Sequence, residues 1–236
     1  MKSKLLLFLL IAICLISMSS CSGLKITPEI QATIDKYISA VSSFAENESG
    51  TVKITTVQED KAIEFKTTES VIDYNYTVAD QKVSFERKDY LDGKENASYK
   101  CDGNSVLMYD YSAEDWVDKT KENSVFLSSK NNPITTLSLF RVDSKYKVKA
   151  KNFTEITEST EGDYTVIKFS LDDSTVSTVL SYNKADGIVR TSAGHTRSYY
   201  LDSDGNIKKI VIEALQNVVN NGNEGSYKSA ITVEIS

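Results

Sequence analysis

Cysteine, proline, histidine and tryptophan are scarce in this chain of 236 residues, which has three Cys, two Pro, one His and one Trp. A single histidine, His195, leaves no histidine pair for metal binding. No G-x-S-x-G, H-E-x-x-H or P-loop motif occurs either. We therefore expect no enzymatic activity, no catalytic residue, no metal and no cofactor, and we interpret His195 as a strand residue.

Arginine is also scarce, with four Arg among the 27 basic residues, and the formal net charge is −6. Residues 1–20 carry two Lys and no other charge, so the remaining chain has a charge of −8. An acidic chain with few arginines argues against nucleic acid as a partner. Two prolines and no linker, repeat or low-complexity stretch indicate one domain, which we place at residues 27–236.

The N-terminus has the pattern of a secretory signal. Lys2 and Lys4 precede twelve apolar residues, 5–16, and small or polar residues follow up to Gly23. Twelve apolar residues are too few to cross a hydrocarbon core of about 30 Å as a helix. The sequence therefore predicts a signal peptide at residues 1–20.

Cys21 directly follows Ser19 and Ser20, with the apolar Met18 ahead of them. This stretch resembles the lipobox of bacterial lipoproteins, where the cysteine becomes a diacylglyceryl cysteine and signal peptidase II cleaves before it. Met18 departs from the Leu that is usual there. The resemblance implies lipidation of Cys21 with palmitate-like chains; the alternative is a plain secreted protein. Residues 21–26 would be a tether, and from Cys21 to a helix that starts near Pro28 the chain reaches about 25 Å, at about 3.5 Å per residue.

Cys101 is then left without a partner, because Cys14 is removed with the signal peptide and Cys21 is acylated. No intramolecular disulfide and no cysteine-based metal site would remain. We interpret Cys101 as a small strand residue rather than a reactive thiol.

The mature chain begins with a pattern typical of an amphipathic helix. Thr27 can cap its start, Pro28 suits the first helical position and Glu29 suits the positive end of the helix dipole. Apolar residues then recur at helical spacing as far as Ala45. The sequence predicts a helix over 28–45 that lies on an apolar surface.

From Gly50 onward, β-branched and aromatic residues alternate with polar ones, which predicts half-buried antiparallel strands. Turn residues recur about every ten positions, as at Asp92-Gly93 and Asn221-Gly222, so the strands should form long hairpins. Two short helices are expected, one after Pro133 and one after Asp172-Asp173. The predicted fold class is α+β: a strongly curved antiparallel sheet, a half-barrel, wrapped around the N-terminal amphipathic helix.

This order of elements resembles the LolA-like superfamily of lipoprotein carriers, which includes the LppX and LprG type lipid-binding lipoproteins. The lipobox, the single helix, the strands and the turn within residues 199–207 carry the resemblance, and no diagnostic motif does. It implies a LolA-like domain that binds a lipid or another apolar ligand between helix and sheet.

Aromatic residues on the predicted strands either pack a solid core or line such a cavity. The cavity candidates are Phe65, Tyr74, Tyr76, Phe85, Tyr109, Trp116, Phe126, Leu137 and Phe169. A solid core would favour the alternative function, a non-catalytic surface lipoprotein that binds a protein or a cell-wall polymer.

Four lysines alternate along one predicted strand: Lys145, Lys147, Lys149 and Lys151. Such a basic surface row protects an edge strand or is simply solvated. Near a membrane it could also contact anionic headgroups or a cell-wall polymer, at about 1 kcal/mol per lysine. Low Arg with abundant Ile and Asn suggests an AT-rich genome, and so the extracytoplasmic face of a Gram-positive cell membrane.

Overall fold

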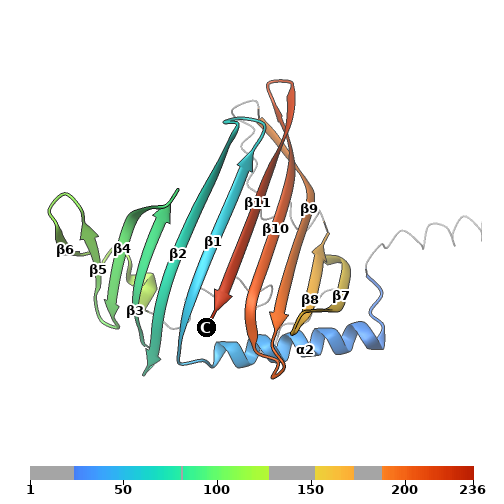
Figure 1. Cartoon of the computed structure of the whole chain (residues 1–236), viewed down its shortest axis with the longest axis horizontal. Helices are drawn as coiled ribbons and strands as arrows, with labels where there is room; N and C mark the ends of the chain where they lie inside the picture. The colour runs from blue at the N-terminus through green and yellow to red at the C-terminus, as the bar shows by residue number, and fades with distance from the viewer. Residues whose placement is uncertain (1–23, 81, 128–151, 173–187) are drawn as a thin grey trace, which may run out of the picture.

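The computed structural model describes residues 24–80, 82–127, 152–172 and 188–236. These residues form one α-helix, α2 (Pro28–Ala45), a short 3-10 helix, η2 (Ser124–Leu127), and eleven strands (Figure 1). The strands are β1 (Ser49–Asp60), β2 (Lys66–Ala79), β3 (Lys82–Leu91), β4 (Lys94–Asp102), β5 (Val106–Asp110), β6 (Asp115–Asp118), β7 (Phe153–Glu161), β8 (Tyr164–Leu171), β9 (Ile188–Leu201), β10 (Ile207–Asn220) and β11 (Asn223–Ile235).

Helix α2 begins and runs as the sequence predicts. The Thr27 side chain accepts a hydrogen bond from the Ile30 amide at 3.4 Å, and Pro28 occupies the first turn, where its missing N–H costs nothing. The apolar positions then fall on one face, which buries Ile34 and Tyr37 among other residues. No helix in the described segments is long and apolar enough to cross a membrane.

All eleven strands belong to one open, antiparallel sheet. Its order is β6-β5-β4-β3-β2-β1-β11-β10-β9-β8-β7, so two series of hairpins meet where β1 pairs with β11. The first and last strands of the chain therefore lie in the middle of the sheet, and β6 and β7 form its edges (Figure 1).

Two-residue turns fix the register of two hairpins, β10–β11 and β3–β4. Asn221 and Gly222 have φ angles of 49° and 86°, and Asp92 and Gly93 have φ angles of 48° and 77°. Successive positive φ angles match the right-handed twist of the strands, and Asn-Gly or Asp-Gly sequences tolerate them best. The turns predicted at both dipeptides are confirmed.

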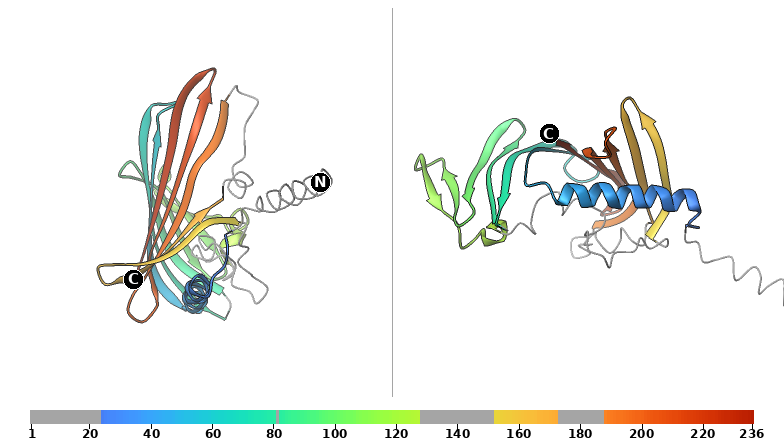
Figure 2. Two further views of the ribbon diagram at one scale, coloured as in Figure 1. Left: turned by 90° about the vertical axis from the view of Figure 1, so that its right-hand side faces the viewer. Right: turned by 90° about the horizontal axis from the view of Figure 1, so that it is seen from below.

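The hydrophobic core lies between α2 and one face of the sheet, which we call the helix-side face. α2 runs across one end of this face, as Figures 1 and 2 show. Core residues alternate along each strand, as expected for a sheet with one buried face. Its central members are Val52, Tyr74, Phe85, Phe169, Tyr199, Ile210 and Val233.

Other predicted elements lie outside the described residues. These are the two short helices, which fall in 128–151 and 173–187, and the strand that would carry the lysine row. The description of the sheet as open and antiparallel, with one N-terminal helix, does not depend on them.

Candidate functional site

Several predicted functional residues also lie outside the described part of the chain. Cys21, Leu137 and the row Lys145, Lys147, Lys149 and Lys151 fall in segments without a described placement, and the side chain of Phe126 is not described either. Their roles remain predictions from the sequence.

Three of the predicted cavity residues form one aromatic group on the helix-side face. Tyr74 and Tyr76 follow each other on β2 with ring centroids 5.7 Å apart, and Phe85 on β3 lies 5.2 Å from Tyr74. All three side chains are buried. Burial also raises the pKa of Tyr74, because the phenolate would lose its hydration.

Phe169 belongs to a second aromatic group, directly under α2. Its ring lies 4.9 Å from that of Tyr37 on the helix and 5.5 Å from that of Phe153 on β7, with Tyr199 completing the group. Such edge-on contacts add to the free energy gained by burial alone. This group attaches α2 to strands β7 to β9.

Tyr109 and Trp116 lie on the opposite, outer face of the sheet. They pair across β5 and β6 with ring centroids 5.4 Å apart, and the Lys100 ammonium sits 4.5 Å above the Trp116 ring. With the side chains of Lys88 and Glu95 they line a pocket of about 300 Å³. The remaining candidate, Phe65, is 76% exposed in the β1–β2 loop. Among the candidates that the structure describes, Tyr109, Trp116 and Phe65 thus lie apart from the aromatic groups of the helix-side face.

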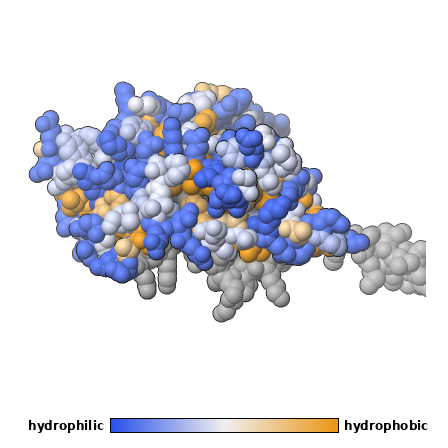
Figure 3. All heavy atoms as spheres, turned by 60° about the horizontal axis from the view of Figure 1, so that its bottom comes forward, coloured by the Kyte–Doolittle hydropathy of each residue, from blue (hydrophilic) through white to orange (hydrophobic). Residues whose placement is uncertain are grey.

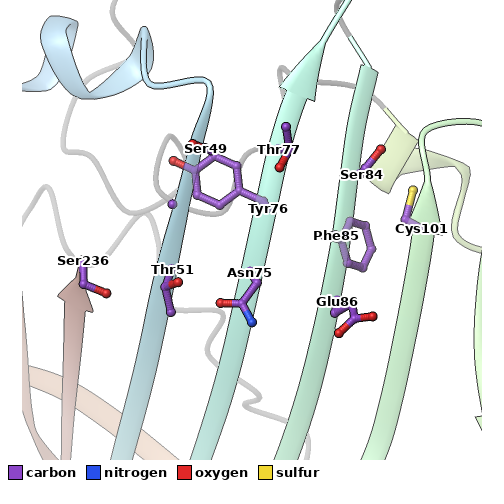
Figure 4. A pocket seen from close by; sticks show the side chains of 11 residues that line it. Ser49, Thr51, Asn75, Tyr76, Thr77, Ser84, Phe85, Glu86, Cys101 and Ser236 are labelled. Atoms are coloured by element: carbon purple, nitrogen blue, oxygen red, sulfur yellow. The ribbon is translucent and has the colours of Figure 1, made fainter.

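A larger pocket of about 560 Å³ lies where β1, β2 and β3 approach the C-terminus of the chain (Figure 4). Polar side chains dominate its lining: Ser49, Thr51, Asn75, Thr77, Ser84, Glu86 and Ser236. Gly50 also lines it, and a Cβ there would lie 3.2 Å from the Tyr76 ring. The pocket is thus a polar depression bordered by the buried aromatic group.

The helix-side face changes in character along the strands. Where α2 covers it, buried apolar residues such as Val233 and Ile210 form the floor. Level with Val233 and Ile210 in the strand pairing lie two half-buried isoleucines, Ile54 of β1 and Ile72 of β2, and a third, Ile231 of β11, lies two residues further along its strand. Seen from below, apolar residues on the accessible surface form small groups among hydrophilic ones (Figure 3).

Toward the β1–β2 and β10–β11 turns, away from α2, polar side chains predominate on the helix-side face, although Val218 there is buried; we call this region the distal end (Figure 1). Pairing across β9, β10 and β11 places five side chains there on one face: Arg190, Ser192, His195, Gln216 and Tyr227. Arg197 lies at the border of this region, level with Ile212 and Ile231 and paired with Phe169 of β8.

His195 and Arg197 contact each other at the border of the distal end. Arg197 Nε donates a hydrogen bond to His195 Nε2 at 3.4 Å. Burial and, secondly, the positive charge of Arg197 lower the pKa of His195 to about 4. His195 is therefore a neutral, polar group at physiological pH.

Gln216 lies in the middle of the distal end and is only 5% exposed. It pairs with Ser192 of β9 and with Tyr227 of β11. Its Oε1 atom is the one buried side-chain nitrogen or oxygen within the described segments that has no hydrogen-bond partner. Buried acceptors are nearly always satisfied, so this atom marks a place for a donor that the described residues do not supply.

The described residues give little basis for a metal site or for a reactive cysteine. Across them, no group of three or more His, Cys, Asp or Glu side chains could hold a metal ion. Cys101 is buried, its thiol donates to the Val83 carbonyl at 3.1 Å, and burial raises the pKa of the thiol. A protonated, enclosed thiol is a poor nucleophile.

Comparison with known proteins gives matches of structure alone. No family model and no curated protein sequence matches the chain. LppX, a lipoprotein of Mycobacterium tuberculosis, matches with a TM-score of 0.47 and 12% identity, over 89% of this chain and 95% of that one. A putative outer membrane lipoprotein-sorting protein domain from Vibrio parahaemolyticus matches with a TM-score of 0.25 and 8% identity, over 85% and 89% of the two chains.

A LolA superfamily protein from Nitrosomonas europaea matches with a TM-score of 0.24 and 8% identity, over 87% of this chain and 90% of that one. LppX and a LolA superfamily protein, of the kind that the sequence resembles, are thus among the structural matches. At these identities and TM-scores the matches carry no argument about ligand or activity.

Proposed function

We propose that this protein is a membrane-anchored extracytoplasmic lipoprotein that binds a lipid or another apolar ligand against the helix-side face. The observation that carries the proposal is the belt of half-buried isoleucines, Ile54, Ile72 and Ile231, which borders the buried floor formed by Val233 and Ile210.

The dimensions of the elements explain why α2 cannot cover the whole helix-side face. β1, with 12 residues, and β10, with 14, are each roughly 40 to 45 Å long at about 3.3 Å per residue. A helix with its side chains is about 10 to 12 Å wide. α2 crosses one end of the strands and can cover only a fraction of the face, so apolar positions beyond it are available to an acyl chain.

Strong curvature of the sheet is the second part of the proposal. A half-barrel around α2 would enclose a ligand on several sides, whereas a flat sheet would leave it exposed to water. The aromatic group of Tyr74, Tyr76 and Phe85 and the group around Phe169 would then form two walls on either side of the isoleucine belt.

The membrane location rests on the sequence. Residues 1–20 fit a signal peptide, Cys21 fits a lipidation site, and the short tether would keep residues 27–236 within a few tens of ångströms of the bilayer. A ligand could then pass between the bilayer and the helix-side face without crossing much water.

Native mass spectrometry of the gently purified lipoprotein tests ligand binding directly. We expect co-purifying lipid in the wild type and less of it in Ile231→Gln, which places an amide in the isoleucine belt. Leu215→Gln is the matched control, because Leu215 lies on the outer face of the neighbouring strand and is 41% exposed. Equal lipid in both variants, or none in the wild type, would contradict the proposal.

Binding of a protein or a cell-wall polymer is the second candidate function. The pocket beside Tyr109 and Trp116 on the outer face of the sheet favours it. Trp116 and Tyr109 are partly exposed there beside Lys100 and Lys88. Aromatic rings flanked by cations are common anchors in interfaces. Loss of cell-wall co-sedimentation in Trp116→Ala, with retained lipid, would support this function over the first.

A further inference from the structure

Gln216 is a buried polar residue that its described neighbours do not satisfy. The side chain is 5% exposed, and within the described segments its Oε1 atom has no hydrogen-bond partner. An acceptor that leaves water without gaining a partner lowers stability, so such atoms are rare in folded proteins. A hydrogen-bond donor from a bound molecule would remove this cost.

An irregularity in β9 surrounds Gln216 with polar side chains. The pairing of β9 with β10 shifts next to Gln216, beside Gly194, whose φ is 155°. A bulge adds one residue to a strand and so reverses the alternation of side chains beyond it. Without the bulge, Arg190 and Ser192 would face the outer side; with it they share the helix-side face with Gln216.

The charged groups beside Gln216 offset each other. The Arg190 guanidinium lies 5.5 Å from the centre of the Tyr227 ring, and Asp60 pairs with Tyr227 from β1. Burial opposes the charge of Asp60, but backbone hydrogen bonds in its own loop and then the charge of Arg190 hold its pKa below the usual value. Burying a further charge beside this pair would be costly, so a neutral partner for Gln216 is favoured.

The β1–β2 loop covers the face just beyond Gln216. Side chains alternate along a strand, so a side chain at Gly225 would point to the helix-side face, as that of Tyr227 does. A Cβ at Gly225 would overlap the Lys61 carbonyl oxygen and Ala62, which places the loop over this face. We therefore expect a ligand group to approach Gln216 along the strands, from the side of the isoleucine belt.

Small side chains lie on that approach. Ala214 of β10 pairs with Ser229 of β11, at the level between Gln216 and the pair of Ile212 with Ile231. Gln216 is four residues from Ile212, which is about 13 Å at about 3.3 Å per residue. One acyl chain spans about half of a hydrocarbon core of about 30 Å. A chain that lies on the isoleucine belt thus brings the group at its end to Gln216.

From this arrangement we propose that Gln216 binds a neutral hydroxyl group of an otherwise apolar ligand, such as the free hydroxyl of a diacylglycerol. A hydroxyl both donates and accepts, so it can pair with either polar atom of the amide. Apolar binding sites commonly use a few polar groups to fix the orientation of the ligand. The inference rests on the proposed function, since the acyl chains of the same molecule would lie on the isoleucine belt.

Four probes separate the hydroxyl site from lipid binding in general. The full-length lipoprotein is mixed with diacylglycerol, with the methyl ether of that diacylglycerol, with phosphatidylglycerol of the same acyl chains, and with free glycerol, and bound ligand is measured by native mass spectrometry. We expect diacylglycerol to bind about tenfold more tightly than its methyl ether, because only the alcohol donates to the buried acceptor. It should also bind more tightly than phosphatidylglycerol, whose charge would be buried. Free glycerol, which lacks acyl chains, should not compete.

Gln216→Leu should bind diacylglycerol and its methyl ether alike. The stability of this variant is a second readout: it loses an acceptor without a partner, so urea unfolding of the protein without added lipid should show no loss of stability. Gln31→Leu is the matched control, because Gln31 lies on the exposed side of α2, where it donates to Asp35 at 2.8 Å. It should keep the tenfold preference, and circular dichroism checks that both variants are folded.

Equal binding of the alcohol and the ether by the wild type would overturn the hydroxyl site and leave the proposed function standing; this is the result if a water molecule satisfies Gln216 instead. A preference that survives in Gln216→Leu, or a less stable Gln216→Leu protein, overturns the assignment to Gln216. Tighter binding of phosphatidylglycerol overturns the neutral class of ligand, and competition by free glycerol overturns the assignment to a lipid. Binding of none of the lipids overturns the proposed function together with the inference.

Discussion

His195 connects the distal end to the pH dependence of stability. Its folded-state pKa of about 4 lies below the ordinary value of about 6.5, so the unfolded chain binds its proton first as the pH falls. The stability that neutral His195 contributes is thus present above pH 6.5 and is lost between about pH 6.5 and 4. Because the side chain is partly exposed, we expect a loss on the order of 1 kcal/mol after allowance for solvent screening.

Urea unfolding at pH 7 and pH 4.5 measures this loss, with His195→Gln as the comparison. The variant keeps a polar group at the position but cannot titrate. Carboxylates titrate in the same range in both proteins, so the difference between the two pH dependences isolates His195. Parallel curves for wild type and variant would show that His195 titrates normally in the folded protein.

Alternation along a strand predicts which residues share a face only as far as the strand is regular. It correctly groups Tyr74 with Tyr76, and it separates Tyr109 from Met108. The distal end could not be predicted in this way, because Arg190 and His195 are five residues apart and would fall on opposite faces of a regular strand. Gly194 is a local sign of the bulge, but a glycine within a strand also occurs at tight bends and where another backbone approaches closely.

At the scale of elements, Tyr37 is the principal contact between α2 and the sheet. It is 1% exposed, and its ring lies 4.7 Å from that of Tyr199 and 4.9 Å from that of Phe169. We expect Tyr37→Ala to lower the free energy of unfolding by about 3–5 kcal/mol, as for other large aromatic truncations in a core. Ile38→Ala is the matched control: Ile38 is the next residue, 36% exposed, and should cost less than about 1 kcal/mol.

Chemical denaturation of both variants tests whether the buried Tyr37 attaches α2 to the sheet. Similar costs at positions 37 and 38 would mean that the helix does not depend on its buried face for attachment. Circular dichroism of Tyr37→Ala should still show the strands, since the sheet ladders do not involve α2.

The β1–β2 loop is held against β11 at Gly225. A Cβ added there would lie 2.4 Å from the Lys61 carbonyl oxygen and 2.7 Å from Ala62 Cα, and both are backbone atoms that cannot rotate away. The Lys61 amide also donates to the Ser226 carbonyl at 2.8 Å. We expect Gly225→Ala to lower the free energy of unfolding by about 1–3 kcal/mol, with Ser226→Ala nearly neutral, both measured by thermal and urea unfolding. An unchanged Gly225→Ala protein would show that the loop does not pack there.

Local elements could be predicted from the sequence, and their assembly could not. Thr27 and Pro28 specify the start of α2, and Asn221-Gly222 specifies a hairpin turn, because each acts on its immediate neighbours. The pairing of β1 with β11 joins residues about 180 positions apart, such as Val52 and Ile235. No turn or cap specifies such a contact; it follows from burying both strands' apolar faces under the same helix.

At the scale of the whole molecule, the helix-side face is apolar near α2 and more polar toward the distal end. Val233 and Ile210 share one level of the paired strands with Ile54 and Ile72, whereas Gln216 lies nearer the distal turns, level with Ser192 and Tyr227. An apolar ligand of the proposed kind would therefore lie at the α2 end of this face, where burying it gains the most free energy.

The proposed position of that face near a bilayer depends on Cys21. Residues 1–20 fit a signal peptide that is removed, and the acyl chains on Cys21 would then anchor the mature protein. We expect Cys21→Ser to lose palmitate incorporation and processing by signal peptidase II, and to be released into the medium rather than retained in the membrane fraction. Ser22→Ala is the control, since it leaves the cysteine in place and should be processed like the wild type. A Cys21→Ser protein that is still cleaved and membrane-bound would contradict the lipid anchor, and with it the argument that the helix-side face meets its ligand at a membrane surface.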